Sequence, residues 1–259
     1  MEYHYIITIN KNKRIGSVIF VVEGRKMEPR IIRNIFNKVL GYDIYQQTQD
    51  KQIIKIGNSN DIYSKVAIVV SDKPQISGVT SFNDYLQESY KRLVDNGLDV
   101  NDSAIYFIFD RDRENNSQEI LEDAIQKLTN SRDNPGFEMN GLLILSYPCI
   151  EALYLNVNND DKKFGNGKSI KTYSGIKKYR KELTMPNILS AANKMLNIIN
   201  QLNIDFSIDD LNDFSVKNQK ILDEEEKTYK EDEVYISLSL LCIALIDLGI
   251  LELDEKQAS

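Results

Sequence analysis

The stretch AIYFIFDRDR, residues 104–113, carries a short apolar run directly into two aspartates. Residues 104–109 are aromatic or aliphatic, and they are apolar on both alternations of an extended chain. This pattern predicts a central β-strand that is covered on both faces. Side chains two residues apart in a strand point the same way, so Asp110 and Asp112 would project together from its carboxyl end. Open α/β sheets place their sites at that end.

Two carboxylates held this close repel each other unless a cation lies between them. Paired oxygen ligands suit Mg²⁺ or Mn²⁺, so Asp110 and Asp112 are candidate ligands for such an ion. The alternative is an acidic turn after a strand, because aspartate favours turns and helix caps through its own side-chain hydrogen bonds. Both interpretations fit this stretch taken alone.

The composition predicts a folded protein that can bury a sizeable core, with 42% hydrophobic and 27% charged residues in 259. The apolar runs are too short to span a bilayer and the N-terminus lacks a signal-peptide pattern, so we expect a cytoplasmic protein without membrane contact. The net charge of −7 argues against nonspecific coating of nucleic acid. Because His4 is the sole histidine, chemistry would depend on carboxylates and lysines. Cys149 and Cys242 lie in apolar surroundings and are expected to be buried thiols, with no disulfide framework or zinc site.

Short apolar runs alternate with helical patterns, which predicts an α/β fold with a mostly parallel sheet flanked by helices. Strands are expected at residues 3–9, 17–22, 53–56, 66–70, 104–109, 141–145 and 250–255. Helices are expected after Gly24 and at residues 81–98, 117–129, 187–202 and 232–248. Residues 1–155 would form the α/β core. Residues 156–259 would form a basic segment and a C-terminal helical appendage packed on that core.

Two further carboxylates follow predicted strands. Glu23 comes after SVIFVV, residues 17–22, at a glycine turn, and Glu151 follows the strand at 141–145, in the first turn of a helix that Pro148 would open. Because neighbouring parallel strands end at one edge of a sheet, both are expected near Asp110. The alternative is an acid at a helix start, which the helix dipole favours. For Glu28, a solvated acid in the first helical turn is the simpler interpretation.

Together these segments resemble the Toprim domain, the metal-binding fold shared by topoisomerases, primases and nucleases of the OLD type. Val22-Glu23-Gly24 followed by Glu28 is similar to the first motif of the family, and Asp110-Arg111-Asp112 is similar to its D-x-D motif. Residues 146–152, SYPCIEA, resemble the serine-x-proline-x-x-glutamate stretch of the RloB-like and DUF4435-like branch. Tyr147 departs from that branch, which often has asparagine there. The resemblance covers residues 15–155.

The resemblance implies a Toprim-like, Rossmann-like fold and a Mg²⁺- or Mn²⁺-dependent endonuclease that cleaves DNA or RNA, such as tRNA, in bacterial defence against phage. It implies Asp110 and Asp112 as metal ligands and Glu23 as a ligand or general base. Secondary candidates are Lys26, Glu28, Glu114 and Glu151. An ATPase partner and a homo-oligomer are compatible with this assignment. The alternative function is a non-catalytic subunit that binds nucleic acid or protein.

A basic segment at residues 162–181 alternates lysines with aromatic residues. Such groups contact phosphates and stack on unpaired bases, which favours a nucleic-acid contact. The candidates are Lys168, Lys171, Tyr173, Lys177, Lys178 and Arg180. The alternative is a solvated lysine-rich helix and loop. Farther along, residues 205–230 are markedly acidic and are expected to form a solvated surface, with docking on a basic partner as the alternative.

Overall fold

The computed structural model describes residues 5–50, 52–71, 81–111, 113, 116–132, 141–179 and 183–255. Its central strand is β6 (Ser103–Asp110), which pairs in parallel with β2 (Ser17–Val22) and β7 (Leu142–Tyr147). β2 also pairs in parallel with β5 (Asp61–Val70). Residues 104–109 are at most 1% exposed, so the predicted buried central strand is confirmed.

Antiparallel strands extend this parallel core on both sides. β3 (Asp43–Gln47) and β4 (Ile53–Asn58) follow β5, and β8 (Leu238–Ser239) pairs with β7, giving the order β3-β4-β5-β2-β6-β7-β8. β1 (Tyr5–Ile9) and β9 (Leu251–Glu255) form a separate antiparallel pair. We did not expect β3 from the sequence, because its side chains are all exposed and its aspartate and glutamines have weak strand propensity.

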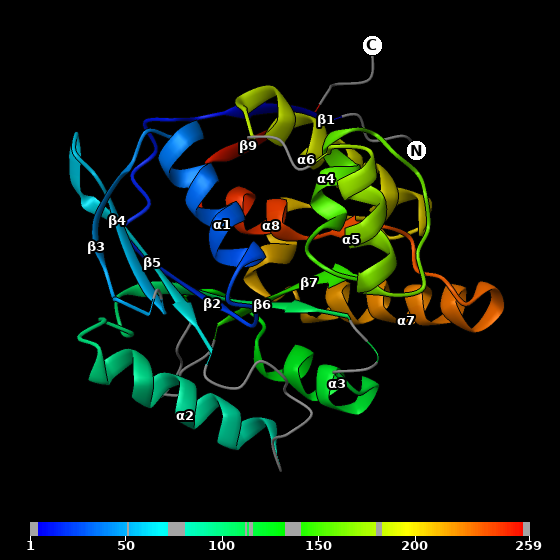
Figure 1. Cartoon of the computed structure of the whole chain (residues 1–259), viewed down its shortest axis with the longest axis horizontal. Coiled ribbons are helices and arrows are strands. Elements are labelled where there is room, and N and C mark those ends of the chain that lie inside the picture. Colours follow the sequence, from blue (N-terminus) through cyan, green and yellow to red (C-terminus); the bar gives the residue numbers. More distant parts are fainter. Residues whose placement is uncertain are drawn as a thin grey trace.

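Helices cover both faces of the sheet (Figure 1). On one side lie α1 (Met27–Arg33), which continues as the π-helix η1 (Asn34–Val39), and α8 (Leu241–Asp247). On the other side lie α2 (Phe82–Asp95) and α3 (Gln118–Lys127). The fold is therefore α/β with a mixed, mostly parallel central sheet flanked by helices, as predicted, and it is consistent with a Rossmann-like arrangement.

Aromatic packing shows how alternate residues of β6 serve the two helical layers. Phe107 packs edge-on against Tyr90 of α2, with ring centroids 6.2 Å apart. Tyr106 points the other way and stacks on Phe20 of β2 at 5.1 Å, and Phe20 in turn packs against Phe36 of η1 at 5.7 Å. Even-numbered residues of β6 therefore face the layer of α1, which also sets the direction of Asp110.

The remaining helices lie in the second half of the chain. They are α4 (Ala152–Val157), α5 (Gly167–Ile176), α6 (Met185–Gln201), the 3₁₀-helix η4 (Ile208–Asn212) and α7 (Ser215–Asp232). The boundary expected near residue 155 falls inside α4, and one hydrophobic cluster holds buried residues of both halves, such as Phe107 and Ile243. Within the described ranges, no helix has both the length and the apolar character needed to cross a membrane.

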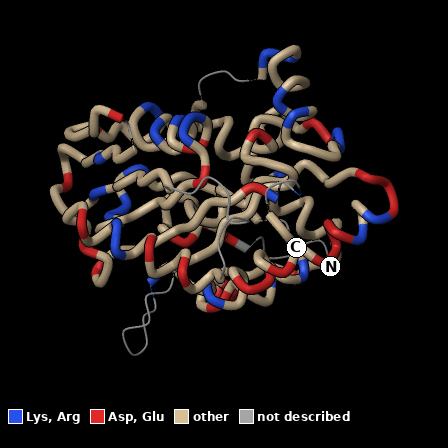
Figure 2. Tube along the Cα trace, turned by 60° about the horizontal axis from the view of Figure 1, so that its bottom comes forward, with Lys and Arg blue, Asp and Glu red and all other residues tan. Residues whose placement is uncertain are grey.

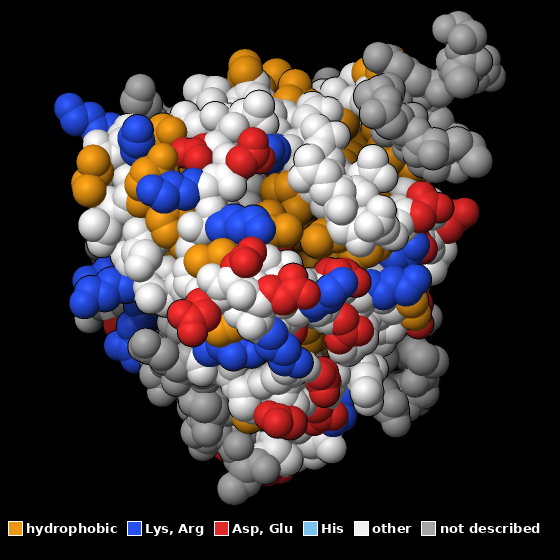
Figure 3. Space-filling view, turned by 90° about the vertical axis from the view of Figure 1, so that its right-hand side faces the viewer, with side chains coloured by type: hydrophobic (Ala, Val, Ile, Leu, Met, Phe, Trp, Pro, Cys, Tyr) orange, Lys and Arg blue, Asp and Glu red, His pale blue; other side chains and the backbone are white. Residues whose placement is uncertain are grey.

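Basic and acidic residues are interspersed along the trace of the chain (Figure 2). On the face shown in Figure 3, Lys and Arg side chains lie beside Asp and Glu side chains instead of forming a continuous basic stripe. A contact with a polyanion on this face would therefore depend on particular side chains and not on a uniform positive field.

The prediction of a helix at residues 232–248 is wrong in its first half. α7 ends at Asp232, Glu233 adopts the left-handed conformation with φ 58°, and the chain then enters β8 before α8 begins at Leu241. The physical reason lies in residues 235–240, YISLSL, where Ser237 and Ser239 alternate with leucines at the period of a strand.

The acidic segment is also not a fully solvated surface. Glu225 and Glu226 of α7 are only 0% and 2% exposed. Glu226 accepts a hydrogen bond from Arg111 Nε at 2.7 Å, and Glu225 accepts one from the Ile236 N–H at 2.9 Å. Burial raises the pKa of Glu225 to about 8, so its carboxyl group holds a proton at neutral pH.

Replacing Glu225 with glutamine should therefore stabilise the protein in alkaline solution. The unfolded carboxyl titrates near 4.5 and the folded one near 8, so the folded state retains a proton in this window and stability falls as the pH rises. Glu225→Gln should raise the free energy of unfolding by about 2–4 kcal/mol at pH 8 and leave it nearly unchanged at pH 4.5. Urea unfolding at both pH values measures this, with Glu224→Gln, 44% exposed on the same helix, as control. Equal effects of the two substitutions at pH 8 would contradict the assignment.

Candidate metal centre

The register of the parallel strands brings the predicted acidic positions to one edge of the sheet. Val22 is paired with Ile108, and Asp110 is paired with Ser146, so the residues after β2, β6 and β7 emerge side by side. Asp110 lies two residues beyond Ile108 and therefore points to the side of α1.

Asp110 is held by main-chain groups of both neighbouring segments. Its Oδ1 accepts a hydrogen bond from the Ile150 N–H at 2.8 Å, and its own N–H donates to Glu23 Oε2 at 3.4 Å. The turn after β7 thus brings Ile150 to Asp110, and α4 begins only at Ala152. The expectation that Pro148 opens the helix is wrong, and Glu151 is the N-cap residue instead of a residue of the first turn.

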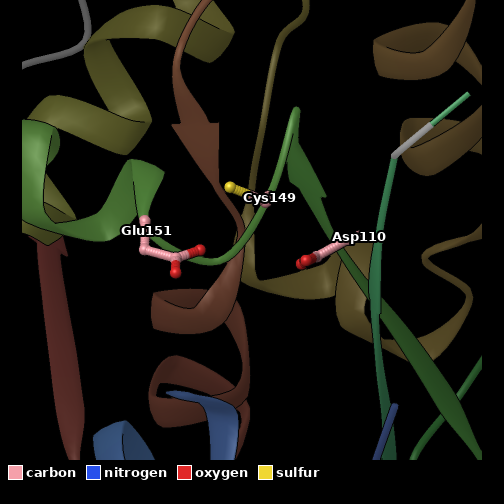
Figure 4. A group of neighbouring side chains, drawn as sticks. All are labelled: Asp110, Cys149 and Glu151. Carbon is pink, nitrogen blue, oxygen red and sulfur yellow. The ribbon is translucent and has the colours of Figure 1, made fainter. Parts of the chain in front are cut away.

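Asp110, Cys149 and Glu151 form a group that could hold a metal ion (Figure 4). One ligand atom from each residue lies within 4.8 Å of the other two. Glu151 is 1% exposed, and neither of its carboxylate oxygens accepts a hydrogen bond within the part of the chain that the structure describes. Lys171 Nζ, from α5, lies 3.9 Å from Glu151 Oε2.

Glu28 adds a further carboxylate from the first turn of α1. It is 7% exposed, so its interpretation as a solvated acid is wrong. Its carboxyl group lies over Gly24, where a Cβ atom would be 2.7 Å from the Glu28 carboxyl carbon. Glycine at this position therefore lets the Glu28 carboxylate approach the turn that follows β2.

Glu23 lies next to Asp110 but is not part of the ligand group. Val22 shares a face of β2 with Phe20, so the next side chain is directed to the α2 side of the sheet. Glu23 Oε1 accepts a hydrogen bond from Asn116 Nδ2 at 3.5 Å, and the Glu23 charge adds to burial in raising the pKa of Tyr85 in α2 to about 12.

Burial and mutual repulsion disfavour the ionised forms of the acids in the cluster. Burial raises the pKa of Asp110 well above its usual range, and the charges of Glu28, Glu23 and Glu151 add to this, while Lys171 opposes it. Burial likewise raises the pKa of Glu28, with a further contribution from Glu151. Burial lowers the pKa of Lys171, but the neighbouring acids, Glu151 first, outweigh it and raise that pKa overall. Such an arrangement favours binding of a cation.

The turn after Asp110 is anchored by a buried arginine that the sequence analysis did not assign to the site. Arg111 is 2% exposed, donates from Nε to Glu226 at 2.7 Å and donates from Nη1 to the Asn116 carbonyl at 2.8 Å. Asn116 Nδ2 donates to the Asp110 carbonyl at 2.8 Å. Arg113 pairs with the same Glu226, and its guanidinium lies 4.2 Å from the Tyr229 ring centroid. The turn is thereby fixed to α7.

Of the basic segment, Lys171 reaches the acidic cluster, whereas Lys168, Lys177 and Lys178 are exposed. Tyr173 is half-buried, packs on Phe164 at 5.3 Å, and donates its hydroxyl hydrogen to Asp160 at 2.9 Å. The Tyr173 ring therefore serves packing within the protein, and stacking on a base would require it to leave these contacts.

Four predicted site residues remain to be placed. Lys26 is exposed at the N-cap of α1. Asp112, Glu114 and Arg180 lie outside the described residues. Cys149 is the ligand candidate that the sequence analysis missed, although its place two residues before Glu151 in the loop after β7 was a usable signal.

No family model, no curated protein and no solved structure matches the chain. The resemblance to Toprim proteins therefore stays a prediction from the sequence motifs.

A divalent cation should stabilise the protein through this cluster. Mn²⁺ at about 100 times its Kd should raise the free energy of unfolding by about 2.7 kcal/mol and Tm by about 5–10 °C, because it binds the folded state and relieves carboxylate repulsion. Thermal unfolding after EDTA treatment measures the shift. Asp110→Asn should abolish it, while Asp254→Asn, at an exposed position of β9, should retain it. An equal shift in both variants would place the ion elsewhere.

Proposed function

We propose that the protein is a divalent-cation-dependent nuclease that hydrolyses phosphodiester bonds of DNA or RNA. The observation that supports this proposal is the acidic cluster at the carboxyl edge of the parallel strands, formed by Asp110, Glu151 and Glu28 with Glu23 beside it. Open α/β sheets place their sites at this edge, and a cation bound by carboxylates is a general means of activating a phosphodiester.

The residues present fit a cation. Asp110 and Glu151 would hold it, because their oxygens lie close together and Glu151 has no hydrogen bond from the described residues. Such a cation polarises the phosphate and lowers the pKa of a bound water. Glu28 would flank it and add negative charge. Glu23, which binds the Asp110 N–H and the Asn116 side chain, would hold the turn that presents Asp110.

Lys171 is the group of this chain that would meet the substrate phosphate. Its Nζ approaches the cluster from α5 and lies 3.9 Å from Glu151, while its side chain remains 48% exposed. An ammonium group in this place stabilises negative charge on the phosphate oxygens. The exposed lysines of the same region, Lys168, Lys177 and Lys178, would contact neighbouring phosphates. A Toprim-type nuclease in anti-phage defence, acting with an ATPase partner, is the finer proposal that the sequence motifs support.

Cleavage by the purified protein tests the function directly. Supercoiled plasmid, single-stranded DNA and total tRNA should be incubated with Mg²⁺ or Mn²⁺, with EDTA as the blank. We expect at least one substrate to be cut, and Glu151→Gln should lower the rate by about 10²-fold or more because a ligand is weakened. Glu224→Gln, at a position of α7 whose side chain is 44% exposed, should cut like the unaltered protein.

Two results would contradict the nuclease proposal. Cutting that survives both Glu151→Gln and Asp110→Asn would come from another enzyme or another site. Cation binding without cleavage of any of the three substrates would favour a non-catalytic subunit that binds nucleic acid or protein.

Lys171→Met should lower kcat/KM by about 10²-fold, mainly through kcat, because the lost ammonium would stabilise charge that develops on the phosphate. Lys220→Met removes one exposed positive charge from α7 and should change kcat/KM by less than about twofold. Steady-state kinetics on the cleaved substrate separate kcat from KM. A rise in KM with unchanged kcat would assign Lys171 to substrate binding alone.

A further inference from the structure

Cys149 stands out as the one thiol among the acidic groups at the edge of the sheet. Its Sγ belongs to the group in which the ligand atoms of Asp110 and Glu151 lie within 4.8 Å (Figure 4). The side chain is 1% exposed. On its other side it packs in a small apolar cluster that includes Leu155 and Phe164. The thiol therefore lies at the border between an apolar cluster and the carboxylates.

Glu151 gives an independent indication that a ligand belongs here. Its carboxylate is 1% exposed, points into the same space as the Asp110 carboxylate, and receives no N–H or O–H donor from the residues that the structure describes, although the Cys149 thiol lies beside it. Lys171 Nζ, at 3.9 Å, is too far away for a hydrogen bond. A buried carboxylate without N–H or O–H donors is costly unless charge compensates it. Lys171 supplies part of that charge, and a bound cation would supply the rest.

The three ligand atoms fit one ion of moderate softness. Metal–sulfur bonds of about 2.3 Å and metal–oxygen bonds of about 2.0–2.2 Å place sulfur and oxygen ligands about 3.6 Å apart in a tetrahedral shell, so side-chain movements of about 1 Å would bring the three atoms onto one ion. Thiolate ligands select softer cations, whereas Mg²⁺ prefers oxygen ligands alone.

We propose that Cys149 is a ligand of the cation and shifts the preference of the site from Mg²⁺ towards thiophilic divalent cations, with Zn²⁺ and Cd²⁺ bound most tightly and Mn²⁺ ahead of Mg²⁺. This inference rests on the cation site of the proposed function. On binding, the thiol S–H bond breaks, the proton passes to solvent and the sulfur–metal bond forms. Cys149 thereby becomes a residue that determines which cation the protein uses.

Cd²⁺ titration with ultraviolet absorption tests the proposal without any substrate, because a thiolate bound to Cd²⁺ gives a charge-transfer band. The unaltered protein should show the band and Cys149→Ser should lose it. Cys242→Ser provides the matched control and should keep the band, since Cys242 is the only other cysteine in the sequence and lies buried in α8. Cys149→Ser should weaken Cd²⁺ binding by at least about tenfold and change Mg²⁺ binding by less than about threefold.

X-ray absorption at the zinc edge examines the unaltered protein and does not depend on the folding of a variant. One sulfur at about 2.3 Å together with oxygen ligands is the expected first shell. A shell of oxygen and nitrogen only, or a Cd²⁺ band that persists in Cys149→Ser, would overturn the proposal.

Cleavage assays on the same samples distinguish this proposal from the nuclease function. A band that depends on Cys149, with no substrate cleaved, would support the thiolate ligand and count against the nuclease. Cleavage that depends on Asp110 and Glu151, with no such band, would overturn the thiolate ligand and leave the nuclease intact.

Discussion

Repulsion among carboxylates is the constraint on which the carboxyl edge of this sheet depends. Asp110, Glu28, Glu23 and Glu151 affect one another electrostatically, and Lys171 is the cation that the described part of the chain brings to them. Parallel pairing of β2, β6 and β7 places these acids together, because each follows or approaches the end of a strand. A divalent cation would relieve this repulsion and stabilise the ionised forms of the acids.

The rest of the fold holds the acids in place against that repulsion. Arg111 links the turn after Asp110 to Glu226 of α7, so residues more than a hundred positions apart fix the direction of the strand end. Gly24 leaves room for the Glu28 carboxylate, and the Ile150 N–H binds Asp110. α7 therefore supports the turn after Asp110, and its buried face carries two glutamates. Glu226 is ionised, and the protonated Glu225 beside it adds no second negative charge.

Local patterns predicted the strands around the site but not their long-range partners. Residues 104–109 and 17–22 were recognised as buried strands because their apolar runs are short and end at acids, and the parallel edge then implied that Asp110, Glu23 and Glu151 converge. The burial of Glu226 depends on Arg111, 115 positions earlier, and no local pattern encodes such a pair. The apolar sequence neighbours of Cys149 predict only a buried thiol, whereas its neighbours in space include two carboxylates. The apolar run at residues 232–248 predicts one helix and hides the strand β8, because only two residues pair there.

Diffraction from crystals soaked in Mn²⁺, with anomalous scattering recorded near the manganese edge, would test the central claim most directly. We expect a single strong peak bonded to carboxylate oxygens of Asp110 and Glu151, with the Lys171 ammonium displaced outward from Glu151. Saturating Mn²⁺ with no peak in the cluster, and with Lys171 still beside Glu151, would contradict it, because the carboxylates would then be balanced without a metal ion.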